Sequence, residues 1–445
     1  MAYGQYSQTP EAVWFNSVPA GWRATKIREL FSERNEKVSD KDFMPLSVGK
    51  MGVVPQLETA VKTDNGDNRK LIRKGDFAIN SRSDRKGSSG ISEYDGSSSL
   101  IITVLKPHNA INGQFYHYLL RSHFFVEEFY RNGHGLVSDL WTTKWEEMRN
   151  IYIPVPPREE QDQIVRYLDW QTSRINKLIH GYEREIKLLE ERKNTVIDSA
   201  VTKGIRPNRD MQQIPTNWIG ANIPIDWKMI PSKRLFTEGK ERKRPEDKPA
   251  TASQKYGIIA QEDYMQKEGK RIVIATQGLD DWKHVDPDNF VISLRSFQGG
   301  IERSAISGCV TWHYIVLIPQ AGVIPQYFKW LLKSKSYIKA LQGTSEFIRD
   351  GQDLRYSNFV KVDLPLVPID EQVEIAQYIE TEVEKIDKAI PVVQKEIDLL
   401  REYRTRLISD VVTGQIDVRG IAIPEYELEV DNSDLESVED VEVEE

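Results

Sequence analysis

The sequence contains one cysteine, Cys309, among 445 residues, and it has no apolar run long enough to cross a membrane. A single cysteine excludes an internal disulfide framework and a zinc site built from several thiolates of this chain. A membrane-spanning helix needs about 20 consecutive apolar residues, and the first residues lack the basic and apolar regions of a secretory signal. We therefore expect a cytoplasmic protein that makes no use of a membrane.

Motifs that mark catalytic sites are also missing from the sequence. It has no Gly-x-x-x-x-Gly-Lys-Ser/Thr phosphate loop and no Asn-Pro-Pro-Tyr or Asn-Pro-Pro-Phe motif of adenine methyltransferases, and its seven histidines have no metal-ligand spacing. Cys309 is flanked by apolar residues, which favours a buried small side chain over a nucleophile. We expect no catalytic residue, metal ion or cofactor in this chain.

The net charge of −8 comes from the C-terminal end of the sequence. Residues 421–445 hold eleven Asp or Glu and no Lys or Arg, so residues 1–420 carry +3, the difference between −8 and −11. A short segment of this composition is expected to be a disordered acidic tail. The overall charge is therefore no argument against a nucleic-acid partner.

An internal duplication organises the chain, because three segments recur in the same order about 205 to 212 residues later. In the first pair, Trp22 matches Trp227, and in the third pair the shift stays at 211 for some fifty residues. A constant shift of that length is hard to obtain by chance. The three pairs are 17–37 with 222–243, 113–125 with 325–337, and 151–202 with 362–413.

Each copy begins with a globular part that has the pattern of a β-rich α+β domain. Short apolar or alternating runs, such as 77–82, 271–276 and 290–295, are separated by clusters of Gly, Asp, Asn and Ser. Residues 114–131 and 326–342 have the composition of accompanying helices, whose aromatic and leucine positions are expected in the core.

The third pair of segments shows a heptad pattern sustained for five heptads, which is typical of long helices that pack along their length. We expect the two helices to pack antiparallel, with Lys193 and Arg404 at one shared seam position. Pro391 should kink or break the second helix, because proline removes a helical hydrogen bond. The residues expected in this contact are Leu168, Ile175, Ile179, Tyr182, Ile186, Leu189, Ile379, Ile386, Val393, Ile397, Leu400 and Leu407.

These motifs resemble those of the specificity subunit of type I restriction-modification enzymes. The resemblance rests on PVPPREEQDQIVRYLD with PLVPIDEQVEIAQYIE, on the helical EIKLLEERKNTVIDSAVTKGI with EIDLLREYRTRLISDVVTGQIDVRG, and on KGDFAINSR. It covers residues 14 to about 420. It implies target-recognition domains at 1–157 and 206–368 and conserved helical regions at 158–205 and 369–420, followed by the acidic disordered tail 421–445.

The resemblance implies a non-catalytic subunit that reads a bipartite sequence in double-stranded DNA. Each recognition domain would read one half of the target, while the helices act as a spacer and as a platform for two modification subunits. S-adenosylmethionine, ATP and magnesium would then belong to those methyltransferase subunits and to the restriction subunits. Two similar but non-identical domains linked by long helices suit an asymmetric two-part target.

The candidate DNA contacts lie in basic loops that follow expected strands, where Lys and Arg can reach phosphates and Arg, Asn and Gln can read base edges. The alternative reading of both basic clusters is a solvated surface loop with acidic neighbours such as Asp76, Asp84, Glu241 and Asp247. In the first domain the candidates are Lys50, Asn80, Ser81, Arg82, Arg85 and Lys86. In the second domain they are Arg242, Lys243, Arg244, Arg295, Ser296 and Gln298, with Gln261, which like Lys50 follows the first expected strand of its domain.

A second hypothesis remains open from the sequence. The chain could be a cytoplasmic scaffold whose paired helices serve assembly and whose globular domains bind protein or small ligands. The basic loops in both copies and the helical motifs favour the DNA-reading hypothesis, because a scaffold needs neither.

Overall fold

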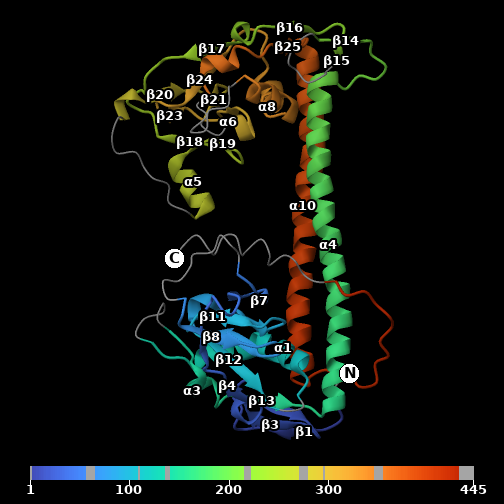
Figure 1. Ribbon diagram of the computed structural model, residues 1–445. Coiled ribbons are helices and arrows are strands. Elements are labelled where there is room, and N and C mark those ends of the chain that lie inside the picture. The colour runs from blue at the N-terminus through green and yellow to red at the C-terminus, as the bar shows by residue number, and fades with distance from the viewer. Residues whose placement is uncertain are drawn as a thin grey trace. The chain divides into compact units, whose positions relative to one another are not determined.

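The computed structural model describes residues 3–56, 66–108, 111–135, 141–214, 222–269, 279–293, 296–344 and 354–429 (Figure 1). The chain forms two compact units, which we call unit 1 (residues 1–183 and 394–445) and unit 2 (184–393). Two long helices, α4 (Arg158–Lys203) and α10 (Ile369–Val412), each contribute to both units. The mixed strand and helix content confirms the α+β class predicted from the sequence.

Unit 1 is built around a four-stranded antiparallel sheet of order β10-β9-β12-β4, in which Ala78 lies opposite Val104. A three-stranded sheet of order β11-β8-β5 and the hairpin β6–β7 complete its main strand layers. The strands are β1 (Tyr6–Gln8), β2 (Ser17–Pro19), β3 (Arg23–Lys26), β4 (Phe31–Glu33), β5 (Lys37–Val38), β6 (Leu46–Gly49), β7 (Gly52–Pro55), β8 (Arg69–Ile72), β9 (Phe77–Asn80), β10 (Ser89–Ile91), β11 (Gly96–Ser98), β12 (Ile102–Pro107) and β13 (Tyr152–Val155). The short helices are η1 (Ile27–Glu29), η2 (Ser83–Arg85), α1 (Gly113–Arg121), α2 (His123–Arg131) and α3 (Trp145–Met148).

Unit 2 repeats this plan with a sheet of order β17-β24-β21-β22, in which Val291 lies opposite Val316. The predicted strand at 271–276 lies outside the described residues. The strands are β14 (Met211–Gln213), β15 (Asn222–Pro224), β16 (Lys228–Ile230), β17 (Phe236–Gly239), β18 (Ala250–Ser253), β19 (Gly257–Ala260), β20 (Lys283–Val285), β21 (Phe290–Ile292), β22 (Glu302–Arg303), β23 (Gly308–Val310), β24 (Ile315–Pro319) and β25 (Leu364–Leu366). The short helices are η4 (Ser232–Arg234), α5 (Gln261–Glu268), η5 (Leu279–Asp281), α6 (Ser296–Gly299), α7 (Pro325–Leu331), α8 (Lys335–Gln342) and α9 (Tyr356–Phe359).

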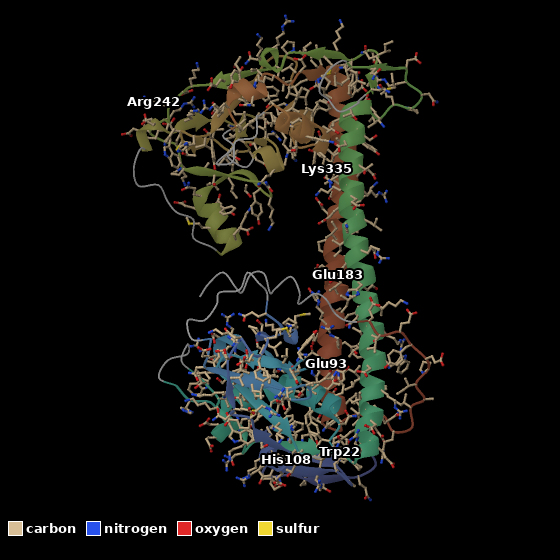
Figure 2. The ribbon with its side chains drawn as sticks, in the orientation of Figure 1. Trp22, Glu93, His108, Glu183, Arg242 and Lys335 are labelled. Atoms are coloured by element: carbon tan, nitrogen blue, oxygen red, sulfur yellow. The ribbon has the colours of Figure 1, made fainter. Side chains whose placement is uncertain are left out.

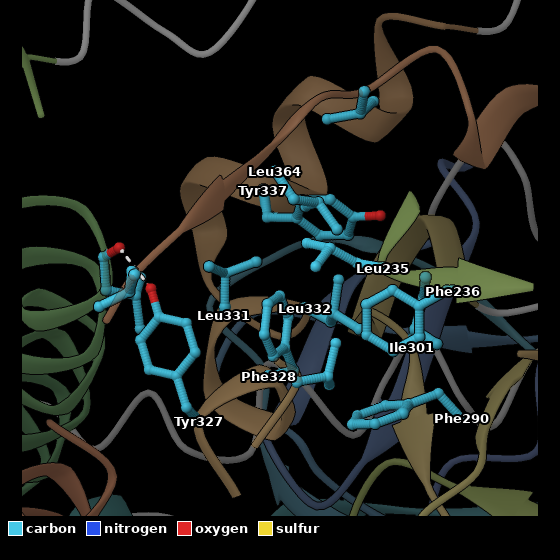
Figure 3. Close-up of a cluster of buried hydrophobic side chains, with 14 of the residues drawn as sticks. Leu235, Phe236, Phe290, Ile301, Tyr327, Phe328, Leu331, Leu332, Tyr337 and Leu364 are labelled. Atoms are coloured by element: carbon cyan, nitrogen blue, oxygen red, sulfur yellow. Dashed lines mark hydrogen bonds between the residues drawn. The ribbon is translucent and has the colours of Figure 1, made fainter. Parts of the chain in front are cut away.

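Aromatic residues fill the core between the sheet and helices of unit 2. Phe236 is fully buried and meets Phe290, Phe328 and Phe359 edge to face, with ring centroids 5.3 to 5.8 Å apart. Figure 3 shows Phe236 with Phe290 and Phe328. The hydroxyl of Tyr327 donates to the carbonyl of Val201 at the end of α4, which joins this core to the helix. The burial of so many apolar side chains is the main force that holds the unit together.

Each of the two predicted accompanying helices is in fact a pair of shorter helices. α1 ends where Ser122 adopts an extended conformation, with φ −62° and ψ 146°, and α2 then begins at His123. Ser334 has the same role between α7 and α8, with φ −66° and ψ 144°. In both cases the serine hydroxyl donates to the carbonyl three residues earlier, which favours a break at that position.

The long helices run antiparallel within each unit. In unit 1, Arg401 pairs with Glu183 at 3.0 Å, and Arg404 Nη1 donates to Asn176 Oδ1 at 2.6 Å. In unit 2, Lys193 Nζ lies 2.6 Å from Asp387 Oδ1. The two seam bases named from the sequence thus both bind a polar group of the opposite helix.

The predicted contact residues of these helices are all at least partly buried. Seven are buried, namely Leu168, Ile175, Ile179, Ile379, Ile386, Ile397 and Leu407, and five are half-buried, namely Tyr182, Ile186, Leu189, Val393 and Leu400. Of the kink or break predicted at Pro391, the break does not occur, because α10 continues through that residue, and the kink stays a prediction. Proline costs about 3 kcal/mol inside a helix, and the buried side chains of Ile386 and Ile397 on either side hold the helix together.

The tail predicted to be disordered begins as an ordered segment. Residues 421–429 lie along α4, where the backbone nitrogen of Glu429 donates to Ser173 Oγ at 3.1 Å and Asn176 donates to the Glu429 carbonyl at 2.9 Å. Ser173 and Asn176 are buried polar residues, and these bonds satisfy them. Residues 430–445 lie outside the described residues.

Candidate nucleic-acid interface

Two of the predicted base-reading residues of unit 1, Asn80 and Ser81, are buried. Asn80 Oδ1 accepts from the backbone nitrogen of Arg82 at 3.1 Å, and Ser81 Oγ donates to the carbonyl of Ile101 at 2.7 Å. The hydroxyl of Tyr130 also donates to the Asn80 carbonyl at 3.3 Å. Both side chains therefore shape the loop after β9, and neither is presented to a ligand in this conformation.

The basic residues of the same loop are more accessible. Arg82 is half-buried, and its side chain has no ion-pair or hydrogen-bond partner among the described residues. Arg85 lies 3.8 Å from Asp84, while Lys86 pairs with Glu127 and lies over the ring of Tyr130. Arg82 is thus the residue of this loop whose charge is most available to an anionic ligand.

Lys50 occupies the turn of the β6–β7 hairpin and is exposed. Its carbonyl accepts a hydrogen bond from Arg121 at the end of α1. Arg121 Nη1 also lies 2.9 Å from Nε2 of His117, and burial together with the nearby Arg121 charge lowers the pKa of His117 to about 3. His117 is therefore neutral at physiological pH, and the turn is held by a fixed guanidinium.

In unit 2, the loop after β21 is described only in part. Arg295 lies outside the described residues. Ser296 is fully buried, and its Oγ accepts from the backbone nitrogen of Ser293 at 2.9 Å, while Gln298 is exposed on α6. Ser296 thus has the same loop-shaping role in unit 2 as Asn80 and Ser81 have in unit 1.

The second basic cluster of unit 2 is already paired with acidic groups of its own unit. Arg242 lies at the surface (Figure 2), 3.4 Å from Asp281, and Lys243 lies 3.3 Å from Asp280. Arg244 makes a two-point contact with Glu241 at 2.7 and 3.2 Å. Exposed pairs of this kind are weak, so an anionic ligand can compete for these cations, but the local charge is close to balanced.

A buried histidine, His284, binds two residues of the loop that carries this basic cluster. His284 Nδ1 lies 2.8 Å from Asp247 Oδ2, and both side chains are almost fully buried. Burial disfavours the charged imidazole, but the hydrogen bonds to Asp247 and Asp286 outweigh it and raise the pKa of His284. The backbone of His284 also donates to the Glu241 carbonyl at 2.9 Å, which ties the cluster to β20.

The sequence reasoning missed the residues that position the hairpin turns. Arg121 binds the turn of β6–β7, and Lys333 donates to the Gln254 carbonyl in the β18–β19 turn at 2.9 Å. The signal was present in the duplication, because Arg121 and Lys333 match in the second pair of repeated segments. Recognising their target required the structure, since each lies some 70 residues or more from the turn it binds.

Within the described ranges, no group of three or more His, Cys, Asp or Glu side chains could hold a metal ion. Over the same part of the chain, no helix has the length and apolar character needed to cross a bilayer. The predicted contacts that the structure describes are loop cations and polar side chains, and such a surface can bind an anion.

The chain is similar to a family of known proteins and to two individual members of it. Residues 19–188 match the family described as "Type I restriction modification DNA specificity domain". The "Putative type I restriction enzyme MjaX specificity subunit" of Methanocaldococcus jannaschii is 21% identical over 401 residues, which cover 87% of each chain. The "Type I restriction enzyme MjaVIII specificity subunit" of the same organism is 23% identical over 302 residues, covering 61% of this chain and 64% of that protein.

A solved structure shares the fold. One chain of the structure described as "Structural basis underlying complex assembly and conformational transition of the type I R-M system" superposes with a TM-score of 0.64 at 16% identity. The match covers 90% of this chain and 99% of that chain. The likeness therefore extends over nearly the whole fold.

Proposed function

From its similarity to type I restriction-modification specificity subunits, we propose that this chain is the non-catalytic subunit that selects the DNA target of such a complex. Each unit would read one half of a bipartite sequence through its loops. The observation that carries this proposal is the duplication of one β-rich unit whose loop residues differ between copies. Two related but non-identical readers suit an asymmetric target.

The proposal includes partners that supply the chemistry. Two modification subunits would dock on the helical regions and methylate adenine with S-adenosylmethionine, and restriction subunits would add ATP- and magnesium-dependent cleavage. The repeated helical segments 151–202 and 362–413 support a platform role, because the chain carries two copies of them. DNA as the ligand also implies a cytoplasmic location.

The DNA contacts that we propose come from loop cations and exposed polar groups. Arg82 is the strongest candidate, because it is partly exposed and no described side chain neutralises it. Asn80, Ser81 and Ser296 would act by shaping the loops that carry the other candidates. Those other candidates are Arg85, Lys86, Arg242, Lys243, Arg244, Arg295 and Gln298, with Lys50 considered separately below.

The test of this function is the methylation pattern that the chain directs. The chain is co-expressed with a methyltransferase subunit encoded beside it, and methyladenine is mapped across the host genome. We expect methylation at a bipartite sequence that disappears when this chain is omitted. Methylation that is unchanged without the chain would contradict the proposal and favour the scaffold hypothesis.

Arg82→Ala should weaken binding of the complex to its mapped duplex by about 1 to 3 kcal/mol, or roughly fivefold to 150-fold, because an arginine at a DNA surface contacts a phosphate or a guanine edge. Fluorescence anisotropy at physiological salt measures the affinity. Arg28→Ala, which removes an exposed arginine bonded to Asn150, is the matched control and should leave it unchanged. Wild-type affinity of the Arg82 variant would remove this loop from the interface.

A further inference from the structure

The two units present equivalent β-hairpins. In β6–β7, Gly49 lies opposite Gly52 across the turn Lys50–Met51, and in β18–β19, Ser253 lies opposite Gly257 across the turn 254–256. The strands before both turns start from a proline whose carbonyl accepts from a glutamine beyond the hairpin: Gln56 to Pro45 and Gln261 to Pro249, each at 3.0 Å. The hairpins are therefore the same element in two copies, the second with a turn one residue longer.

A basic side chain from the neighbouring helical segment holds each turn by a backbone carbonyl. Arg121 donates to the carbonyl of Lys50, and Lys333 Nζ donates to the carbonyl of Gln254 at 2.9 Å. Arg121 and Lys333 occupy matching positions in the duplicated helical segments. The interaction between helix and turn has therefore been retained while most of the surrounding sequence has changed.

Each holding residue also contacts a second side chain. Arg121 lies 2.9 Å from Nε2 of the half-buried His117, and Lys333 binds the carboxylate of the buried Glu302 at 2.9 Å. Glu302 is only 4% exposed, and burial raises its pKa, although the charge of Lys333 opposes this. A turn that is fixed in this way loses little conformational freedom when it meets a ligand.

The residues common to the two hairpins fall into two groups. Gly52 and Gly257 are retained for a backbone reason, because their φ angles of 101° and 71° lie in the left-handed region. Lys50 and Lys255 have no such reason, since both are exposed at the turn. Lys255 pairs with Glu268 at 3.2 Å and lies over the ring of Tyr256, 4.9 Å from its centroid, but its side chain is still 70% exposed. Lys50 has no side-chain partner among the described residues.

We propose that the two hairpin turns are a duplicated contact with the DNA backbone, in which Lys50 and Lys255 each bind a phosphate of the half-site read by their own unit. Arg121 and Lys333 are positioning residues that hold the turns. An ammonium group is a point charge that suits phosphate in any sequence, and so it can be shared by two units that read different bases. This inference rests on the proposed function and adds to it the element that anchors each unit on the duplex.

The test uses the complex with its modification subunits and a duplex that carries the mapped target. Lys50→Ala and Lys255→Ala should each weaken binding about threefold to tenfold at 0.15 M salt and lower the slope of log affinity against log salt by about 1. The loss should be the same for the target and for a scrambled duplex. Lys106→Ala in unit 1 and Lys335→Ala in unit 2, both at exposed lysines away from the turns, are the controls.

The positioning role is tested by replacing Arg121 with an uncharged residue and, separately, with the lysine that unit 2 has at this position. Arg121→Gln should weaken binding, whereas Arg121→Lys should restore it, because unit 2 uses lysine at this position. Chemical unfolding of the same variants checks that the fold is kept. A stability loss in Arg121→Lys equal to that in Arg121→Gln, with equal loss of binding, would show a merely structural residue and overturn this assignment.

The outcomes separate the inference from the proposed function. Unchanged affinity and salt slope in both lysine variants of a complex that still binds its target overturn the inference and leave the function standing. A loss limited to the target duplex, with the slope unchanged, overturns the assignment to phosphate. A wild-type complex that binds no duplex overturns both.

Discussion

Replacing Phe236 by alanine is expected to lower the free energy of unfolding of unit 2 by about 3 to 5 kcal/mol. The side chain is fully buried on β17, and three other phenylalanine rings meet it edge to face. Truncation removes these contacts and leaves a cavity. The three neighbouring rings lie on different elements, so they cannot all move inward to fill it. The loss is comparable with the whole stability of many domains.

Urea unfolding combined with hydrogen exchange resolved by peptide measures this effect, because exchange reports on unit 2 separately. Amides of α7 and α8 should exchange much faster in the variant than in the wild type. Trp312→Ala removes an aromatic side chain that is 52% exposed in the same unit, and its cost should stay below about 1 kcal/mol. Equal protection in wild type and Phe236→Ala would show that this cluster does not determine the stability of the unit.

Glu371→Ala is expected to lower the stability of unit 2 by about 3 kcal/mol, because it removes one partner of a buried ion pair. Glu371 lies in the first turn of α10 and is fully buried, where it pairs with Arg209 and accepts from Trp227 Nε1 at 3.1 Å. Without the carboxylate, the guanidinium of Arg209 is left with Asp226 alone. The variant should therefore loosen the junction between the end of α4 and the start of α10.

Glu374→Ala is the matched control, because Glu374 lies in the same turn region but is half-exposed and pairs with the exposed Arg206. Its cost should stay below about 1 kcal/mol. Proteolysis near residues 204–210, followed over a urea series, locates the effect. If the two glutamate variants unfold at the same denaturant concentration, the buried pair contributes no more than an exposed one.

The sequence was sufficient for the features that repeat with a period. The heptads predicted both long helices and the residues that face each other, since burial along a helix follows the spacing of its apolar side chains. At Pro391 it allowed for a break that the helix does not show, because the local cost of proline was weighed without the packing of Ile386 and Ile397 that offsets it. It also treated residues 421–429 by composition alone, whereas polar side chains of α4 bind their backbone.

The candidate site was only partly accessible to sequence reasoning. A basic loop after a strand can be found in a sequence, but whether a side chain in it faces outward depends on contacts with distant residues. The Asn80 side chain accepts from the backbone nitrogen of Arg82, and Ser81 donates to the distant carbonyl of Ile101. Arg121 donates a hydrogen bond to the carbonyl of Lys50, 71 residues earlier in the chain, and no local sequence pattern encodes this contact.

Unit 1 is formed by two separate segments of the chain, and this affects the order in which the chain folds during synthesis. Unit 2 is one continuous stretch, 184–393, and can form as soon as that stretch leaves the ribosome. Unit 1 needs residues from both ends of the chain, so the apolar face of α4 that carries Leu168 and Ile175 must wait for Ile397 and Leu407. The first unit to be translated is therefore the last to be completed, and its exposed helix is the part of the nascent chain most in need of a chaperone.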